Sequence, residues 1–118
     1  MNNLSSLLCV FALLFVGVCH AETKTKFYEN GQKKSEIDYK DGKLHGLRRT
    51  WHENGQKKSE INYVADKLHG LETKWTADGQ KLYEMEYKDD KRNGLATYWT
   101  ADGKVKTQIM WKDGKKVG

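Results

Sequence analysis

The chain repeats itself every 24 residues, and this period constrains its fold more than any other feature. The stretch from Trp51 to Tyr63 returns in altered form from Phe27, from Trp75 and from Trp99. Two series of glycines keep the same step of 24, namely Gly31, Gly55, Gly79, Gly103 and Gly46, Gly70, Gly94, Gly118. A fixed period of this length predicts an array of equivalent supersecondary units. The four repeats are residues 23–46, 47–70, 71–94 and 95–118.

Each repeat carries two turn signals, separated by segments rich in Trp, Tyr, Ile and Thr. The first signal reads Glu-Asn-Gly or Ala-Asp-Gly, and the second is Lys40-Asp41-Gly42 with its equivalents. Turn signals at regular short spacing predict a chain of β-hairpins. The expected fold is all-β, a single-layer antiparallel meander of about eight strands. Its structural turn glycines are Gly31, Gly42, Gly55, Gly79, Gly103 and Gly114.

The length of the hairpin loops decides which side chains share a face of the sheet. Loops of two and of three residues are both common with Asn-Gly. A three-residue loop over residues 53–55 places Trp51 with Ile61 and Tyr63, whereas a one-residue slip would separate them. With the same loop length over residues 40–42, odd-numbered residues share one face throughout. The predicted aromatic face, with all four tryptophans, contains Trp51, Tyr63, Trp75, Tyr87, Trp99 and Trp111.

That aromatic face is the one feature that suggests a function. Most of it is interpreted as structural, because a chain this small has few other apolar side chains to bury. A single-layer sheet nevertheless cannot cover the face by itself. Trp and Tyr are enriched where protein interfaces concentrate their binding energy. The hypothesis is that the face binds another protein segment or a second copy of the chain.

No catalytic or metal-binding pattern stands out. A phosphate-binding glycine loop, a nucleophile elbow and zinc-ligand spacing are all missing from the sequence. Glu36, Glu60 and Glu84 form a periodic column, which offers identical environments rather than an acid and a base with separate pKa values. His45 and His69 stand one period apart and are interpreted as sheet residues beside a turn. The prediction is a chain that is not an enzyme and uses no metal and no cofactor.

Residues 1–21 have the character of a secretory signal peptide. Residues 7–18 form an apolar run that is too short to cross a bilayer. Cleavage after Ala21 would leave residues 22–118 without cysteine, because Cys9 and Cys19 both precede the cut. The expected location is therefore the periplasm or the cell exterior. A lipid anchor on Cys19 is the less favoured alternative, since it requires a small residue where Val18 stands.

The formal charge of +5 is interpreted as a source of solubility and of protection for the sheet edges. Lys24 and Lys26 would guard the first edge, and Lys112, Lys115 and Lys116 the last. Attraction to anionic membrane lipid or to a cell-wall polymer is the alternative function, exerted through lysine-rich rims. Nucleic acid is not an expected partner, because an exported chain rarely meets any.

The stretch from Asp41 to Leu47, followed by Trp51, resembles the MORN repeat, a β-hairpin unit. The stretch from Tyr28 to Tyr39 resembles the bacterial variant of that repeat, whose chains are often labelled antitoxin components of toxin–antitoxin systems. The sequence departs from the ordinary pattern where Leu47 follows Gly46, and where Asn93 replaces histidine. The resemblance implies a meandering sheet with an aromatic groove and a binding function: protein scaffolding, dimerisation or lipid binding. It implies no common catalytic chemistry.

Overall fold

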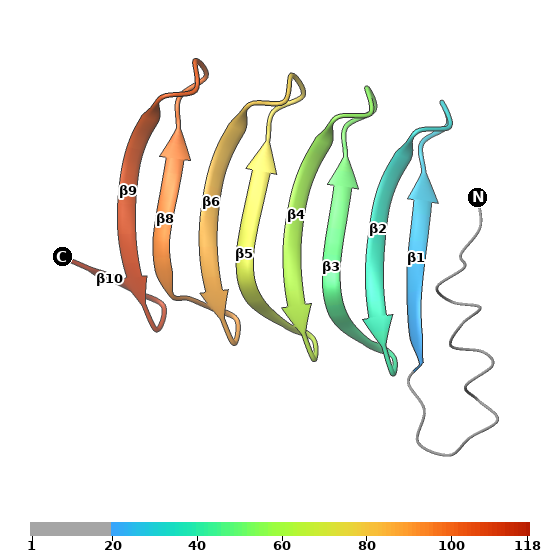
Figure 1. Ribbon diagram of the computed structural model, residues 1–118, viewed down its shortest axis with the longest axis horizontal. Coiled ribbons are helices and arrows are strands. Elements are labelled where there is room, and N and C mark those ends of the chain that lie inside the picture. Colours follow the sequence, from blue (N-terminus) through green and yellow to red (C-terminus); the bar gives the residue numbers. More distant parts are fainter. Residues whose placement is uncertain (1–19) are drawn as a thin grey trace.

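The computed structural model describes residues 20–118, which form one antiparallel sheet (Figure 1). Its strands are β1 (Ala21–Phe27), β2 (Lys33–Lys40), β3 (Lys43–Trp51), β4 (Lys57–Val64), β5 (Lys67–Trp75), β6 (Lys81–Lys88), β7 (Lys91–Arg92), β8 (Gly94–Trp99), β9 (Val105–Lys112) and β10 (Lys115–Val117). Neighbours in the chain are neighbours in the sheet, and the short β7 pairs with β6 beside β8.

The predicted all-β single-layer meander is confirmed, with ten strands where about eight were expected. An interruption at Asn93 separates β7 from β8, and β10 is an additional short strand at the last edge. The predicted signal peptide lies outside the described residues except for His20 and Ala21, and Ala21 already begins β1. No helix able to span a membrane occurs in the part of the chain that the structure describes.

The long turns have the three-residue loop that the sequence predicts. The Tyr28 N–H donates to the Gln32 carbonyl at 2.8 Å, and the Gly31 N–H donates to the Tyr28 carbonyl at 3.0 Å. The same two bonds recur in residues 52–56, 76–80 and 100–104. The third loop residue must have positive φ, which glycine adopts at little cost. Accordingly, φ is between 86° and 91° at Gly31, Gly55, Gly79 and Gly103.

The short turns correct the sequence-based expectation, because their loops have two residues and not three. Lys40 pairs directly with Lys43, so only Asp41 and Gly42 lie in the loop, with φ of 51° and 78°. Two successive positive φ angles define the type I′ turn, whose twist matches that of the flanking strands. In the second repeat Asp66 occupies the position of Gly42, with φ of 69°.

The predicted segregation of odd and even residues is wrong, and the pairing register shows why. Beside each long turn one strand contains an extra residue: Trp51 pairs with Lys57, whereas Thr50 pairs with Ser59. A bulge of this kind reverses the parity of all the pairs that follow it. The two-residue short turns have the same effect, since Lys40 pairs with Lys43. Even residues of one strand therefore share a face with odd residues of the next, and the six predicted aromatic residues divide between two faces.

We name the two faces after their aromatic residues. The tyrosine face contains Ile37, Tyr39, Ile61, Tyr63, Glu72, Lys74, Tyr83, Met85, Tyr87, Ala96, Tyr98, Ile109 and Trp111. The tryptophan face contains Phe27, Glu36, Asp38, Leu47, Arg49, Trp51, Glu60, Leu71, Thr73, Trp75, Glu84, Leu95, Thr97 and Trp99. Trp111 is thus separated from the other three tryptophans by the thickness of the sheet.

The second glycine series marks another irregularity, where the strands after the short turns approach their neighbours closely. Gly46 and Gly94 have φ of 112° and 125°. A Cβ atom at Gly94 would lie 2.5 Å from Glu86 Oε2, and one at Gly46 would lie 3.1 Å from Asp38 Cβ. Both the backbone conformation and the available space therefore require glycine here.

The sheet has almost no core. Among the apolar residues of the described chain, only Met85 and Ala96 are buried, at 2% and 0% exposure. Both belong to the tyrosine face. A single layer leaves each large side chain partly open to solvent, so most contacts that stabilise the fold are between neighbouring strands.

Candidate binding faces of the sheet

The tryptophans of the tryptophan face form a column in which each ring lies beneath a lysine of the preceding strand. The Lys33 ammonium is 5.6 Å from the centroid of the Trp51 ring and 2.6 Å from Glu36 Oε2. A cation held over an aromatic face is attracted by the ring quadrupole. The arrangement recurs at 5.6 and 5.4 Å, with the carboxylates at 2.9 and 2.8 Å, in the groups Trp75, Lys57, Glu60 and Trp99, Lys81, Glu84.

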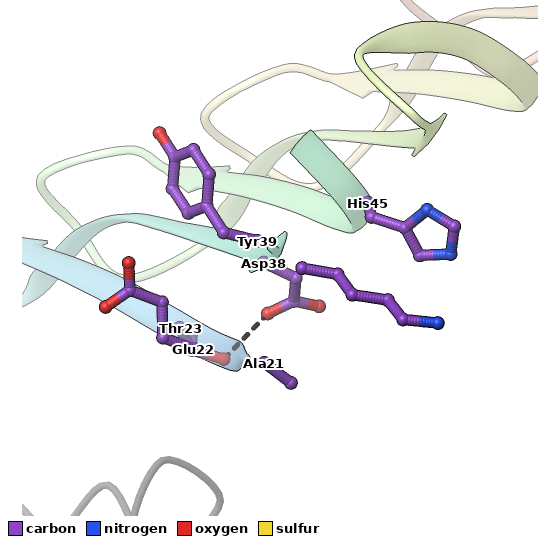
Figure 2. Close-up of a pocket in the computed structure, with 7 residues that line it drawn as sticks. Ala21, Glu22, Thr23, Asp38, Tyr39 and His45 are labelled. Atoms are coloured by element: carbon purple, nitrogen blue, oxygen red, sulfur yellow. Dashed lines mark hydrogen bonds between the residues drawn. The ribbon is translucent and has the colours of Figure 1, made fainter. Parts of the chain in front are cut away.

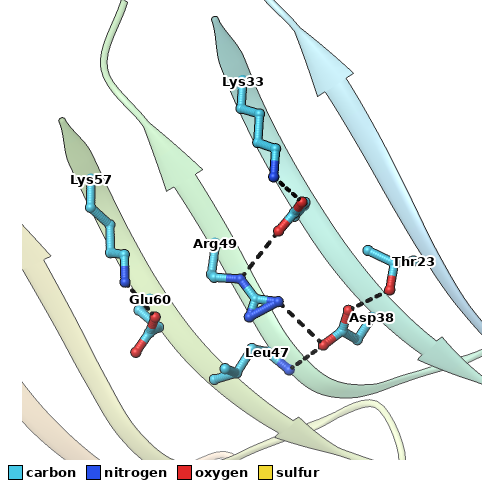
Figure 3. A network of polar contacts seen from close by, with 8 residues as sticks. Thr23, Lys33, Asp38, Leu47, Arg49, Lys57 and Glu60 are labelled. Carbon is cyan, nitrogen blue, oxygen red and sulfur yellow. Dashed lines mark hydrogen bonds and ion pairs between the residues drawn. The ribbon is translucent and has the colours of Figure 1, made fainter. Parts of the chain in front are cut away.

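A polar network extends from the first of these groups (Figure 3). Arg49 contacts two carboxylates, with its Nε 3.4 Å from Glu36 Oε1 and a terminal nitrogen 3.7 Å from Asp38 Oδ2. The Thr23 hydroxyl donates to Asp38 at 2.8 Å. The hydrogen bond from Lys33, followed by the charges of Lys33 and Arg49, holds the pKa of Glu36 below its ordinary value. This network links the first three strands.

Next to the network, a shallow hollow of about 260 Å³ opens at the first edge of the sheet (Figure 2). Asp38 and Thr23 line it, together with Tyr39 and His45. The Asp38 carboxylate is already hydrogen-bonded to Thr23 and paired with Arg49. The other carboxylate in the lining, Glu22, lies 3.6 Å from Lys24 Nζ. The hollow therefore offers no carboxylate that lacks a partner, and we assign it no ligand.

The tyrosine face carries an apolar row that continues through all four repeats. In each repeat, Ile or Met is followed two residues later by Tyr or Trp on the same side of the sheet. None of the eight side chains except Met85 is fully buried. The row consists of Ile37, Tyr39, Ile61, Tyr63, Met85, Tyr87, Ile109 and Trp111.

One cluster on the tyrosine face breaks the repeat symmetry. Glu72 is only 7% exposed and accepts a hydrogen bond of 2.9 Å from the Tyr83 hydroxyl. Lys74 Nζ lies 3.9 Å from the same carboxylate, and the Tyr83 and Tyr98 ring centroids are 5.7 Å apart. Burial, followed by the hydrogen bond to Glu72, raises the pKa of Tyr83 far above its ordinary value. Burial likewise raises the pKa of Tyr87.

Sequence reasoning missed this cluster, because Glu72 and Lys74 have even numbers and were therefore expected on the face opposite the aromatic residues. A signal was nevertheless present in the aligned repeats. Glu72 stands where the second repeat has Arg48 and the fourth has Ala96, and Tyr83 stands where the second repeat has Ser59. A site that is specific to one part of the array is expected at positions where one repeat has a different residue from the other repeats.

His45, and Asn93 at its equivalent position two periods later, each accept a hydrogen bond from a neighbouring turn, which agrees with the interpretation of His45 as a residue beside a turn. The Ala65 N–H donates to His45 Nδ1 at 3.2 Å, and the Asp113 N–H donates to Asn93 Oδ1 at 3.2 Å. Imidazole and amide thus perform the same task at equivalent positions. Within residues 20–118, no three His, Cys, Asp or Glu side chains are grouped so that they could hold a metal ion.

Comparison with known proteins identifies the repeat. The family described as MORN repeat variant matches residues 23–41, 44–65, 68–89 and 92–113. No curated protein and no solved structure matches the chain significantly. Each matched segment contains one long turn and its two flanking strands, and each ends in a short turn. Because these four consecutive segments cover well over half of the chain, the protein belongs to the MORN repeat variant family.

Proposed function

We propose that the protein is an exported, non-catalytic scaffold that binds a protein partner through the tyrosine face. One observation carries the proposal: every repeat adds an Ile or Met and a Tyr or Trp to one continuous row. No other element of residues 20–118 lies over this row. A large apolar patch on a soluble protein marks a site of interaction. MORN repeats are often binding modules for proteins or membrane lipids, which supports the class of function.

The tyrosine face is favoured over the tryptophan column because the column is already occupied from within the chain. Lys33 covers Trp51, and its ammonium is fixed by Glu36. A partner that approached this ring would have to displace the lysine and separate its ion pair. On the tyrosine face the two end rings are covered in the same way, with Lys24 4.8 Å from the Tyr39 centroid and Arg92 4.7 Å from the Trp111 centroid. In the middle of the row, by contrast, Ile61 and Tyr63 have only neighbouring strands of the same sheet beside them.

The Glu72 cluster supports a binding role rather than catalysis. A general base needs a pKa near the working pH, whereas the pKa of Tyr83 is raised and its hydroxyl stays protonated at neutral pH. The Tyr83 hydroxyl and the nearby Lys74 ammonium both stabilise the Glu72 carboxylate. The cluster thus holds Glu72 in place and presents rigid tyrosine rings to a partner.

One specific form of this proposal is an antitoxin-like protein that neutralises a toxin. Residues 1–21 would then export the protein, and the two would meet in the periplasm or outside the cell. Support comes from the signal-like leader and from the label often given to chains of this variant, which the sequence resembles.

Site-specific photo-crosslinking in the producing cell tests the proposal. A photoreactive phenylalanine analogue replaces Tyr63 or Tyr87 in one set of variants, and Asn62, on the opposite face, in the control. A discrete protein adduct is expected from both tyrosine positions and not from Asn62. Absence of an adduct at Tyr63 and Tyr87, or equal yield at Asn62, would refute binding through this face.

The second candidate function is binding to anionic lipid or cell-wall polymer, and the charge distribution favours it. Residues 91–118 contain seven Lys and Arg against two Asp, whereas residues 1–90 contain fourteen charges of each sign. The whole excess of +5 therefore lies in residues 91–118, at the C-terminal end of the array. Vesicles with phosphatidylglycerol would bind the protein at low salt and release it at high salt, because screening weakens attraction between exposed charges.

A further inference from the structure

The last repeat lacks half of a neighbouring strand that every other repeat has. Residues 35–37 of β2 pair with residues 48–50 of β3, and residues 59–61 of β4 pair with residues 72–74 of β5. The equivalent residues 107–109 of β9 have no strand on their outer side within the described chain. The short β10 pairs only with Met110 to Lys112, beside one end of β9 (Figure 1).

β1 is equivalent to the strand that is missing beside residues 107–109 of β9. Phe27 of β1 stands one period before Trp51 and three periods before Trp99. Like the first strand of every repeat, β1 runs antiparallel to its following partner, and no strand of residues 20–118 pairs with its other side. A β1 strand from another molecule thus has the direction and the residue spacing that the open part of β9 requires.

Exposed apolar side chains mark both ends. Phe27 and Val105 are 53% and 56% exposed, the two highest values among the large apolar residues of the described chain. Inside the array, Trp51 lies under Lys33, and Val105 stands three periods after Lys33. Inside the array a lysine covers a tryptophan of the next repeat. At the two ends of the sheet the equivalent residues, Val105 for the lysine and Phe27 for the tryptophan, have no such partner among the described residues.

We infer that β1 of one copy adds to the open edge of β9 of a second copy, so that molecules join head to tail in register. The internal repeats supply the register of this contact. Phe27 would lie beside Val105, and Thr25 opposite Gln108, as Thr73 lies opposite Glu60. Main-chain hydrogen bonds between the added strand and the sheet edge would supply the affinity.

The edge lysines agree with this pairing and oppose the others. Lys26 and Lys24 would face Thr107 and Ile109, as Lys74 faces Ser59 and Arg48 faces Ile37 inside the array. Pairing of two β1 strands, in contrast, would bring lysines of both copies together. Like charges directly across a strand pair are destabilising. The edge lysines therefore favour pairing of β1 with β9 over pairing of β1 with a second β1.

The fit has a condition that involves the leader. In the period of 24, β10 takes the place that residues 19–21 would take in a following repeat. A second copy that begins at Glu22 overlaps the first only at Gly118, which lies after β10. A copy that keeps its leader would have to displace β10. The inference therefore rests on the proposed cleavage after Ala21 and makes that cleavage the step that permits assembly.

Sedimentation velocity on residues 22–118, which contain every strand apart from Ala21, tests the inference. The contact involves a short stretch of strand, so the association is expected to be weak and visible only at high protein concentration. A head-to-tail contact leaves one free edge at each end of every oligomer. The average mass should therefore rise with concentration without a plateau at the dimer.

Two single variants distinguish this contact from any other. Phe27→Glu disables the first edge and Val105→Glu disables the last, so each variant alone should remain monomeric. An equimolar mixture has one intact edge of each kind and should form dimers and nothing larger. Leu82→Glu is the matched control, because Leu82 is 44% exposed but lies within the array, and it should associate like the parent chain.

A parent chain that stays monomeric up to about millimolar concentration would overturn the inference, as would a mixture of the two variants that fails to dimerise. Circular dichroism confirms that each variant is folded. Failure of this test leaves the proposed tyrosine-face function intact, since Phe27 and Val105 lie outside the tyrosine row. Conversely, a failed crosslink at Tyr63 does not affect the edge contact.

Discussion

The first two repeats and the last two have the same backbone but are held together by different interactions. In residues 23–70, polar groups connect neighbouring strands: Arg49 bridges Glu36 and Asp38, and the Asn54 amide donates to the Ala77 carbonyl of the next long turn at 2.7 Å. In residues 71–118, Thr73 and Thr97 replace Arg49. In these two repeats the aromatic packing around Glu72 connects the neighbouring strands instead.

The long turns show the same contrast. The turns of the first half carry asparagine, which bonds both its own loop and the following turn. In the second half the equivalent residues are Asp78 and Asp102, which accept from Thr76 and Thr100 within their own turns. A period of 24 thus fixes where strands and turns lie and leaves open whether a repeat depends on its neighbours.

The largest effect is expected from the packing of the second half. Tyr83→Ala removes the ring that packs on Tyr98 and the hydroxyl that donates to buried Glu72. It should lower the free energy of unfolding by about 2–3 kcal/mol. Ser59→Ala, at the equivalent position of the first half, loses the 2.6 Å hydroxyl contact with Thr50 and should cost about 1 kcal/mol. Urea unfolding of both variants measures the difference, and equal losses would remove the contrast.

Arg49→Thr tests the network of the first half by installing the residue that the other half contains. Glu36 and Asp38 would lose their shared cation, at a cost of about 1–2 kcal/mol at neutral pH. Because the pKa of Glu36 is lowered in the folded state, its contribution is present above its unfolded pKa and is lost as the pH falls through the folded one. Unfolding followed from pH 7 to pH 3 should therefore show a smaller loss of stability in the variant than in the parent.

Exchange of turn residues between the halves should have a smaller effect. Asn54→Asp keeps the acceptor for the Gln56 N–H but removes the donor to Ala77, so a loss of about 0.5–1 kcal/mol is expected. Asp102→Asn is the reciprocal variant and should change stability less, since no bond from the fourth long turn to another turn depends on it. A larger loss from Asp102→Asn in thermal unfolding would contradict the assignment.

The smallest effect is expected at Asp66, where two contributions oppose each other. Asp66→Gly relieves the positive φ of 69° but removes the carboxylate that accepts from the Leu44 N–H at 2.7 Å. Relief and loss are each about 0.5–1 kcal/mol, so the net change should lie within about 0.5 kcal/mol. From the sequence alone, with Gly42 at the equivalent position, Asp66→Gly is expected to stabilise the protein. A gain above about 1 kcal/mol would show that the hydrogen bond to Leu44 contributes nothing.

The sequence by itself determined the period, the turn positions and the fold class. These depend on local chemistry: Gly55 ends a three-residue loop because it readily adopts positive φ, and segments rich in Ile, Tyr and Trp favour strands over helices. Membership of the family follows from the same local features, which recur in four matched segments.

Only the tertiary structure decided which side chains meet. A single extra residue beside each long turn moves all side chains of one strand to the opposite face. No local sequence preference near Lys57 predicts this bulge. The same displacement moved Trp111 away from Trp99 and placed Glu72 among tyrosines. Because successive side chains of a strand point to opposite faces, the register between strands decides which side chains share a face. That register is set by pairing between strands and not by local sequence.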